Sequence, residues 1–324
     1  MTPIAYLILA HQEPSQCQRL IEALRSSSTR VFVHVDAKVD SRAFAVNRPN
    51  VVFVRDRIAV NRGGWSLTRA MVRTLRAAFI QSDCRYFIFL AGTDYPIKPQ
   101  GYIASFLDDR YPMNFINYYP LLNGASGLWN FDRYHFVDQS CWVARMLKFK
   151  TQGFEDRDVK FCRLVDRLNR ALPRRVFPKA SLPFRGSDRW CLNRDTVRYV
   201  LECWRSRLGR RYRRYFRYTW GSDEMLFQTM IFNSRLAEQC HLYDAEAVRA
   251  MAEGSQEPWT DEVKANVHYV DWNEEREDPA ILDERDYARL EGTEALFASK
   301  FYTHRSAGLL ALVDARLRRE VPET

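Results

Sequence analysis

Cysteine pairs and long apolar runs are both missing from this chain of 324 residues. Its seven cysteines are scattered and form no Cys-x-x-Cys pair, so the sequence indicates neither a zinc site nor a disulfide framework. No apolar run reaches the roughly 18 residues of a membrane span, and the run at residues 4–10 lacks the basic leader and cleavage site of a signal peptide. We therefore expect a cytoplasmic protein, either free or peripheral at the inner face of a membrane.

Two common nucleotide-binding motifs are missing as well. The first apolar run is followed by no Gly-x-Gly-x-x-Gly, and the chain has no Gly-x-x-x-x-Gly-Lys-Ser/Thr loop, which argues against a Rossmann dehydrogenase and a P-loop enzyme. The one Asp-x-Asp, at Asp156 and Asp158, opens a polar segment with helical character. We interpret it as an acidic helix start, which the helix dipole favours, and not as a metal site.

What the chain does have is a regular alternation of strand and helix signals. Its hydrophobic fraction of 46%, with 14% aromatic residues, excludes disorder. Strands are predicted at 4–10, 30–35, 51–54 and 86–90, with helices at 14–26 and 67–80. Two further strand-like runs, 113–118 and 181–193, flank a helical segment at 155–172. This order predicts an α/β fold with a mostly parallel sheet. No linker divides the chain, so we expect a single domain over 1–324.

The most informative stretch is Arg85 to Lys98. The apolar run Tyr86–Leu90 ends in the small residues Ala91-Gly92-Thr93, which place Asp94 just beyond the strand. Ligands of open α/β sheets bind outside the carboxyl ends of the strands, so Asp94 is a candidate site residue. The alternative is that Asp94 only caps the turn before Pro96.

Positive charge is concentrated in one segment. Between Arg205 and Arg217, seven of thirteen residues are arginine and none is acidic, in a chain of net charge +9. Such a segment attracts polyanions or an anionic membrane face, and its interleaved aromatic residues could stack on nucleic-acid bases. The alternative is a solvated basic loop.

Several motifs together carry a resemblance to glycosyltransferase family 14, which contains the Core-2/I-branching β-1,6-N-acetylglucosaminyltransferases and the peptide O-xylosyltransferases. The match extends from residue 4 to about 315. Its segments, in chain order, are 5–11, 34–36, 63–66, 91–98, 186–200, 222–234 and 294–301. The resemblance implies a GT-A-like fold and an inverting, metal-independent transfer from a nucleotide-sugar, with UDP-GlcNAc or UDP-xylose as the expected donor. Residues 1–120 would form the nucleotide-sugar-binding half, and 121–324 the acceptor-binding and catalytic half.

The resemblance also implies roles for single residues. Glu224 would be the catalytic base, because an inverting transfer needs a carboxylate to take the proton of the acceptor hydroxyl. Asp223 would orient it. The residue pattern itself predicts Ser222 as the N-cap of the helix that carries both, and the alternative is that the two acids only complement the helix dipole. Without a bound metal, positive side chains must stabilise the leaving diphosphate, a role that the resemblance gives to Lys300.

The remaining predicted contacts concern both substrates. Arg276 is our choice for the arginine that pairs with Lys300, with Arg285 as the reserve. Donor contacts are further expected at Leu9, Asp36, Gly63, Gly64 and Asp94, with Asp36 on the uracil edge. Acceptor contacts are expected at Arg133 and Trp190, for which core packing is the alternative.

No cofactor other than the nucleotide-sugar co-substrate is expected. The acceptor would be a glycan or another hydroxyl compound, joined in a β-linkage. Two other classes of protein stay open at this point. One is a sugar transferase that acts on nucleic acid held by the arginines of 205–217. The other is a non-catalytic protein that binds polyanions or membranes.

Overall fold

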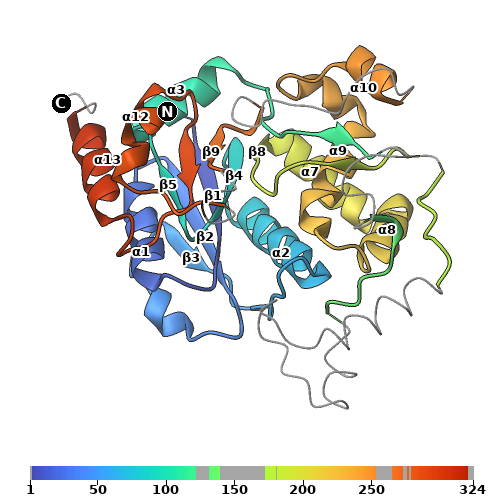
Figure 1. Cartoon of the computed structure of the whole chain (residues 1–324), viewed down its shortest axis with the longest axis horizontal. Helices are drawn as coiled ribbons and strands as arrows, with labels where there is room; N and C mark the ends of the chain where they lie inside the picture. Colours follow the sequence, from blue (N-terminus) through green and yellow to red (C-terminus); the bar gives the residue numbers. More distant parts are fainter. Residues whose placement is uncertain are drawn as a thin grey trace.

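The central sheet has five strands in the order β3-β2-β1-β4-β8 (Figure 1). This computed structural model describes residues 2–121, 131–138, 172–179, 181–252, 265–272, 276 and 279–319. The five strands are β1 (Ile4–Ala10), β2 (Thr29–Val35), β3 (Val51–Phe53), β4 (Tyr86–Ala91) and β8 (Cys191–Asn193). The first four are mutually parallel, and β8 runs antiparallel to β4. The predicted α/β class with a mostly parallel sheet is therefore confirmed.

Helices cover both faces of this sheet because its strands are apolar on both sides. Tyr6 and Ile8 of β1 belong to one hydrophobic core, whereas Ala5 and Leu7 belong to another. The first core includes residues of α1 (Pro14–Ala23), α3 (Gln100–Asp109), α12 (Tyr287–Gly292) and α13 (Ala307–Arg319). The second includes residues of α2 (Trp65–Gln81), α7 (Arg194–Arg205), α8 (Arg207–Phe216) and α9 (Leu226–Phe232). Figure 1 shows the two groups of helices on opposite sides of the sheet.

A second sheet fastens the last part of the chain to the end of β4. Strand β10 (Phe297–Ser299) lies between β5 (Asp94–Pro96) and β9 (His268–Val270). It is antiparallel to β5, with Ser299 opposite Asp94. Lys300 is therefore held at the carboxyl end of β4, about 200 positions away along the sequence.

The smaller elements complete the described fold. They are β6 (Tyr119–Pro120), paired with β7 (Phe184–Arg185), the helix α10 (Ala245–Ala252) and four 3-10 helices: η1 (Ser41–Phe44), η2 (Ser222–Glu224), η3 (Arg235–Gln239) and η4 (Glu284–Asp286). In the described part of the chain, no helix is long and apolar enough to cross a membrane. The five described cysteines are buried and unpaired.

Four local predictions need correction. Residues 113–118 form only isolated bridges, at Asn114 and Phe115, and the run 181–193 splits into β7 and β8. The basic stretch is no loop, because most of it forms α8 with Tyr212, Tyr215 and Phe216 buried. Ser222 does not cap a helix that carries Glu224: η2 begins after Gly221, and α9 starts only at Leu226. The pair Asp156/Asp158 lies outside the described residues, and so does the predicted helix at 155–172 except for its last residue.

Candidate active site

The carboxyl ends of β1, β2 and β4 meet at one edge of the sheet. The Asp36 amide, just after β2, donates to the Ala10 carbonyl at 2.8 Å. The Gly92 amide, just after β4, donates to the Leu9 carbonyl at 2.8 Å. Loops that carry Asp36 and Asp94 are thereby joined to the end of β1, which is where ligands of open α/β sheets bind.

Asp36 organises the loop that follows β2. Its side chain accepts hydrogen bonds from the backbone amides of Lys38, at 2.8 Å, and Val60, at 3.3 Å. The Lys38 ammonium lies 3.8 Å from the same carboxylate. A carboxylate has about four acceptor positions, so these contacts leave room for a donor such as a uracil N3–H. The contact with uracil remains a prediction, as does the contact at Leu9, which is partly exposed at the end of β1.

Positive side chains from three distant parts of the sequence act electrostatically on His11, directly after β1. Burial lowers the pKa of His11, and Lys38, Arg62 and Lys300 lower it further by repulsion, while Asp36 opposes them. The Lys300 ammonium lies 5.4 Å from the centre of the Tyr302 ring. Lys300 thus lies at the predicted edge of the sheet. Lys38 and Arg62 were missed, because a basic residue in a loop gives no sequence signal of where it will point.

Asp94 is at the predicted place, but it faces the protein. It is completely buried, and its Oδ2 accepts from the Ala91 amide at 2.8 Å. Its Oδ1 pairs with Arg189 at 3.2 Å. The predicted direct contact with the donor does not fit this burial, because Asp94 has no exposed surface. Its carboxylate instead supports the turn after β4, as the alternative expected, and pairs with Arg189.

Arg189 is a further residue that the sequence did not indicate. It bridges Asp94 and Asp188, the latter at 2.5 Å, and it lies 3.4 Å from the Ser299 hydroxyl. Although burial opposes its charge, the two carboxylates raise the pKa of Arg189 above the ordinary arginine value. This arginine therefore holds the segment before Lys300 against the end of β4.

Glu224 ends η2 and is held by one arginine. The Nε and an Nη of Arg185 donate to Glu224 Oε2 at 3.0 and 2.7 Å. Within the described residues no hydrogen bond is made to Oε1, and the side chain is 34% exposed. Burial raises the pKa of Glu224, and the Arg185 charge opposes that rise. The result is a partly exposed carboxylate with one oxygen held by Arg185 and the other without a hydrogen bond from the described residues.

Asp223, next to Glu224, has a different environment. It is buried, and its Oδ1 has no hydrogen-bond partner among the described residues. Burial raises the pKa of Asp223 well above the usual range, and the negative charges of Glu224 and Asp188 add to the rise. A protonated Asp223 avoids an unpaired negative charge beside the Glu224 carboxylate. Its predicted role as an orienting neighbour remains a prediction.

Gly63 supports the turn that carries Glu224, and Gly64 packs against Asp138. Gly63 has φ +68°, and a Cβ there would lie 2.6 Å from the Trp220 ring. The Gly63 carbonyl accepts from the Gly221 amide at 3.0 Å. At Gly64 a Cβ would lie 2.6 Å from an oxygen of Asp138. These contacts are all with protein atoms, and they explain why glycine stands at both positions without any contact to a bound sugar donor. The predicted contact with the sugar donor stays a prediction.

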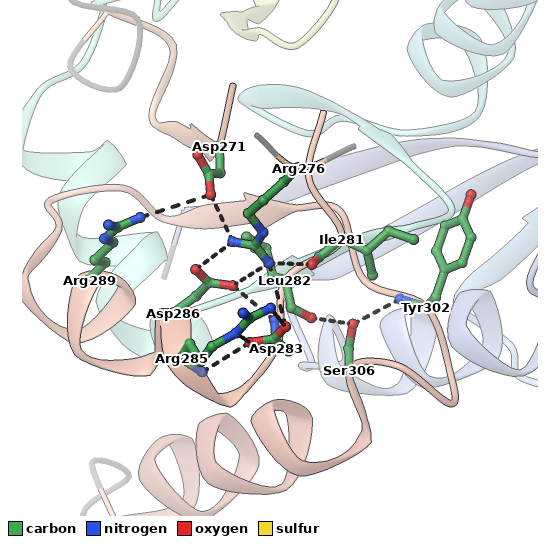
Figure 2. A network of polar contacts seen from close by, with 10 residues as sticks. All are labelled: Asp271, Arg276, Ile281, Leu282, Asp283, Arg285, Asp286, Arg289, Tyr302 and Ser306. Atoms are coloured by element: carbon green, nitrogen blue, oxygen red, sulfur yellow. Dashed lines mark hydrogen bonds and ion pairs between the residues drawn. The ribbon is translucent and has the colours of Figure 1, made fainter. Parts of the chain in front are cut away.

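Arg276 lies in a network of carboxylates (Figure 2). One terminal nitrogen donates to Asp271 and Asp286, both at 2.9 Å, and the other donates to the Ile281 carbonyl at 2.6 Å and to Asp286 at 3.2 Å. All four terminal N–H groups are therefore in use. Arg285, the reserve, is 78% exposed and pairs with Asp283. This arrangement contradicts a phosphate contact for Arg276 and gives Arg285 no visible link to the site.

The two predicted acceptor residues have different outcomes. Trp190 is completely buried, with ring centroids 5.3 Å from Phe89 and 5.1 Å from Phe227. The prediction of an acceptor contact at Trp190 is wrong, because neither face of the ring can reach a sugar. Arg133 is partly exposed, and its carbonyl accepts from Arg175 at 3.0 Å. Its acceptor contact stays a prediction.

Two carboxylates of this region are each paired with an arginine. Over the described residues, no group of three His, Cys, Asp or Glu side chains is arranged to hold a metal ion. Asp188 is paired with Arg189, and Glu224 is paired with Arg185. With basic side chains at the sheet edge and a partly exposed carboxylate on η2, this α/β protein has side chains suited to group transfer.

Comparisons with known proteins identify the family. The family model of the Core-2/I-branching enzymes matches residues 4–291. The chain therefore belongs to this family of glycosyltransferases, which confirms the resemblance seen in the sequence motifs.

Individual relatives agree with this assignment. Xylosyltransferase 1 of Rattus norvegicus is 25% identical over 71% of this chain and 26% of its own length. Human xylosyltransferase 1 is 26% identical over 71% of this chain and 22% of its own length. Human beta-1,3-galactosyl-O-glycosyl-glycoprotein beta-1,6-N-acetylglucosaminyltransferase 3 is 30% identical over 30% of this chain and 24% of its own length. The chain thus spans about a quarter of the length of these relatives.

Proposed function

We propose that this protein is an inverting glycosyltransferase that moves a sugar from a nucleotide-sugar to a hydroxyl group of a glycan or protein, without a metal ion. Family membership supports glycosyl transfer, and the names of the relatives favour xylose or N-acetylglucosamine as the sugar. UDP-xylose and UDP-GlcNAc are therefore the donors we propose. The observation that carries the proposal is the partly exposed Glu224 carboxylate, which Arg185 holds through Oε2 while the described residues make no hydrogen bond to Oε1.

Oε1 of Glu224, which Arg185 does not hold, can act as the general base. The acceptor hydroxyl would give its proton to Oε1 while its oxygen attacks the anomeric carbon, and the bond from that carbon to the diphosphate breaks on the opposite face. Arg185 keeps the carboxylate ionised and fixes its direction through Oε2. Asp223, with its raised pKa, would remain neutral beside it.

The leaving diphosphate needs positive charge, because its negative charge grows as the glycosidic bond breaks. Lys300, Lys38 and Arg62 all act electrostatically on His11 at the sheet edge, and they can supply that charge. In this proposal Lys38 and Arg62, and not Arg276, are the basic residues that act with Lys300 on the diphosphate. Asp188 and Glu224, each already paired with an arginine, are poorly suited to hold a cation as well, which supports a mechanism without a metal.

The alternative of a sugar transferase on nucleic acid loses one of its two supports. Tyr212, Tyr215 and Phe216 are buried in the core and cannot stack on bases, whereas the arginines of 205–217 that would hold a phosphate backbone remain. A non-catalytic protein would not need Glu224 to be held in this way.

The proposal is tested by measuring transfer and donor hydrolysis with UDP-xylose and UDP-GlcNAc in EDTA, in the parent and in Glu224→Gln. Glutamine keeps the shape of the side chain but cannot take a proton, so kcat should fall at least about a hundredfold, with donor affinity nearly unchanged. Glu238→Gln, on the exposed surface of η3, is the matched control and should behave like the parent. Activity that vanishes in EDTA and returns with Mn²⁺ would contradict the metal-independent mechanism. Normal turnover in Glu224→Gln would place the base elsewhere.

A further inference from the structure

Two adjoining hollows lie on the surface formed by α2, α7 and α8. Their volumes are about 390 and 320 Å³, and they share Arg69, Trp204 and Arg213 as lining residues. We call the two together the arginine groove. Arg73 and Arg76 of α2 extend the lining of the first hollow.

The second hollow is lined by arginines of α8 and its end. Arg210, Arg214 and Arg217 follow one another at helical spacing, so they share one face of the helix. The arginine-rich segment seen in the sequence therefore contributes only one of its faces to the groove. The opposite side of the groove is formed by α2, about 140 positions earlier in the chain.

The charge of the groove is not balanced from within. Among its described lining residues there is no aspartate or glutamate. Arg69, Arg210 and Arg214 are exposed, and the described part of the chain provides no ion pair for them. Burial lowers the pKa of Arg213, and repulsion by Arg210 lowers it further. A bound anion would relieve this repulsion.

The shape and the aromatic residues indicate what kind of anion fits. Trp204 is stacked on Trp65, with centroids 5.6 Å apart, and the Arg213 guanidinium lies 4.9 Å from its ring, so Trp204 offers little surface for a base. A flat bilayer would rest on the rims and leave the hollows unfilled. Planar guanidinium groups bind carboxylate, phosphate and sulfate in pairs of hydrogen bonds. Two adjoining hollows therefore suit a chain with at least two such groups.

The groove also begins close to the turn that carries the catalytic base. Trp65, which lines the second hollow, is in the first turn of α2. In the same turn, the Thr68 hydroxyl is 2.7 Å from the Ser222 hydroxyl, at the start of η2. Glu224 ends that short helix. A polymeric ligand that contacts Trp65 would therefore be bound at the same helical turn as Thr68, which contacts the start of the short helix that carries Glu224.

We propose that the arginine groove binds an anionic glycan, a sugar chain with repeated carboxylate, phosphate or sulfate groups, and that this glycan is the acceptor. The assignment as acceptor rests on the proposed function, whereas binding in the groove does not. Charge-bearing units remote from the reacting hydroxyl would hold the acceptor, so that its binding energy helps to position that hydroxyl.

Binding is tested by calorimetric titration of an alginate hexasaccharide, which carries a carboxylate on every unit, with cellohexaose as the neutral control. The variant Arg210→Gln/Arg214→Gln removes two groove arginines. The matched control Arg207→Gln/Arg211→Gln removes two exposed arginines of the same helix that do not line the groove. Losing two charge-assisted contacts should weaken alginate binding about tenfold or more. The control variant should bind like the parent, and cellohexaose should not bind.

Several results would overturn the proposal. Equal weakening in the two double variants would mean attraction to net charge alone. Binding to phosphatidylglycerol vesicles or to an oligodeoxynucleotide, without binding to alginate, would assign the groove to a membrane or to nucleic acid. Melting temperatures of both variants check that each is folded. Donor hydrolysis by the parent without any acceptor tests the proposed function separately, so that either idea can fail alone.

Discussion

Replacing Arg185 by glutamine would remove the positive charge beside Glu224 and leave a shorter, neutral polar side chain. In the protein, both hydrogen bonds from Arg185 go to Oε2, at 3.0 and 2.7 Å. Burial raises the pKa of Glu224, and Arg185 is the largest influence that lowers it. Without Arg185 the pKa of Glu224 should rise further, so the base would become ionised only at higher pH.

The size of this effect follows from the distance and the exposure of the pair. Two unit charges about 4 Å apart interact by roughly 4 kcal/mol at an effective dielectric constant of about 20, and by roughly 1 kcal/mol in water. The Glu224 side chain is 34% exposed, which places the pair between these limits. Since about 1.4 kcal/mol corresponds to one pH unit, the acidic limb of kcat/KM should move upward by about one to two pH units.

The measurement is the pH profile of kcat/KM for Arg185→Gln, with Arg42→Gln as a control that removes an exposed, ion-paired arginine of η1. We expect the control to keep the parent profile. The Arg185 variant should lose activity most at low pH and regain much of it at high pH, whereas Glu224→Gln should be impaired throughout. An acidic limb that stays in place, or one that moves downward, would refute the assignment of Arg185 as the residue that keeps the base ionised.

Three more predictions separate ligand contacts from structural ones. Lys300→Ala should weaken binding of UDP but not of uridine, measured by calorimetry, because only UDP carries the phosphates; unchanged UDP affinity would remove Lys300 from the site. Arg276→Gln should lower the free energy of unfolding in urea by about 3 kcal/mol, since it leaves buried carboxylates unpaired, while UDP affinity stays the same. Gly63→Ala should lower both stability and kcat because its Cβ would overlap the Trp220 ring, whereas Gly101→Ala, where a Cβ meets no atom within 4 Å, should do neither.

Local sequence patterns were sufficient for the first half of the fold. The apolar runs near residues 4, 30 and 86 form β1, β2 and β4 almost as predicted, because strands buried on both faces need continuous apolar residues. The same reasoning failed at 181–193, which is equally apolar in part but is broken by Gly186 to Arg189. The turn there is set by partners from elsewhere: the Gly186 amide donates to the Glu224 carbonyl, at 2.8 Å.

Burial divided the predicted site residues into those that can meet a ligand and those that cannot. Asp94 and Trp190 stood in family motifs, yet both are completely buried. A motif shows that a residue type is needed at a position, but not whether the reason is contact with substrate or support of a neighbour. For Asp94 the structure shows support, through its ion pair with Arg189.

The sequence by itself determined the class of the protein: the order of strands and helices, the family, and the place of Glu224 and Lys300 within its motifs. These features are local, since each depends on the spacing of residues within a short segment. Only the tertiary structure decided which charges meet. Arg185 reaches Glu224 across 39 positions, and Arg189 reaches Asp94 across 95. Ion pairs form between side chains that folding brings together. Because the partners are far apart along the chain, no local sequence pattern shows that they will meet.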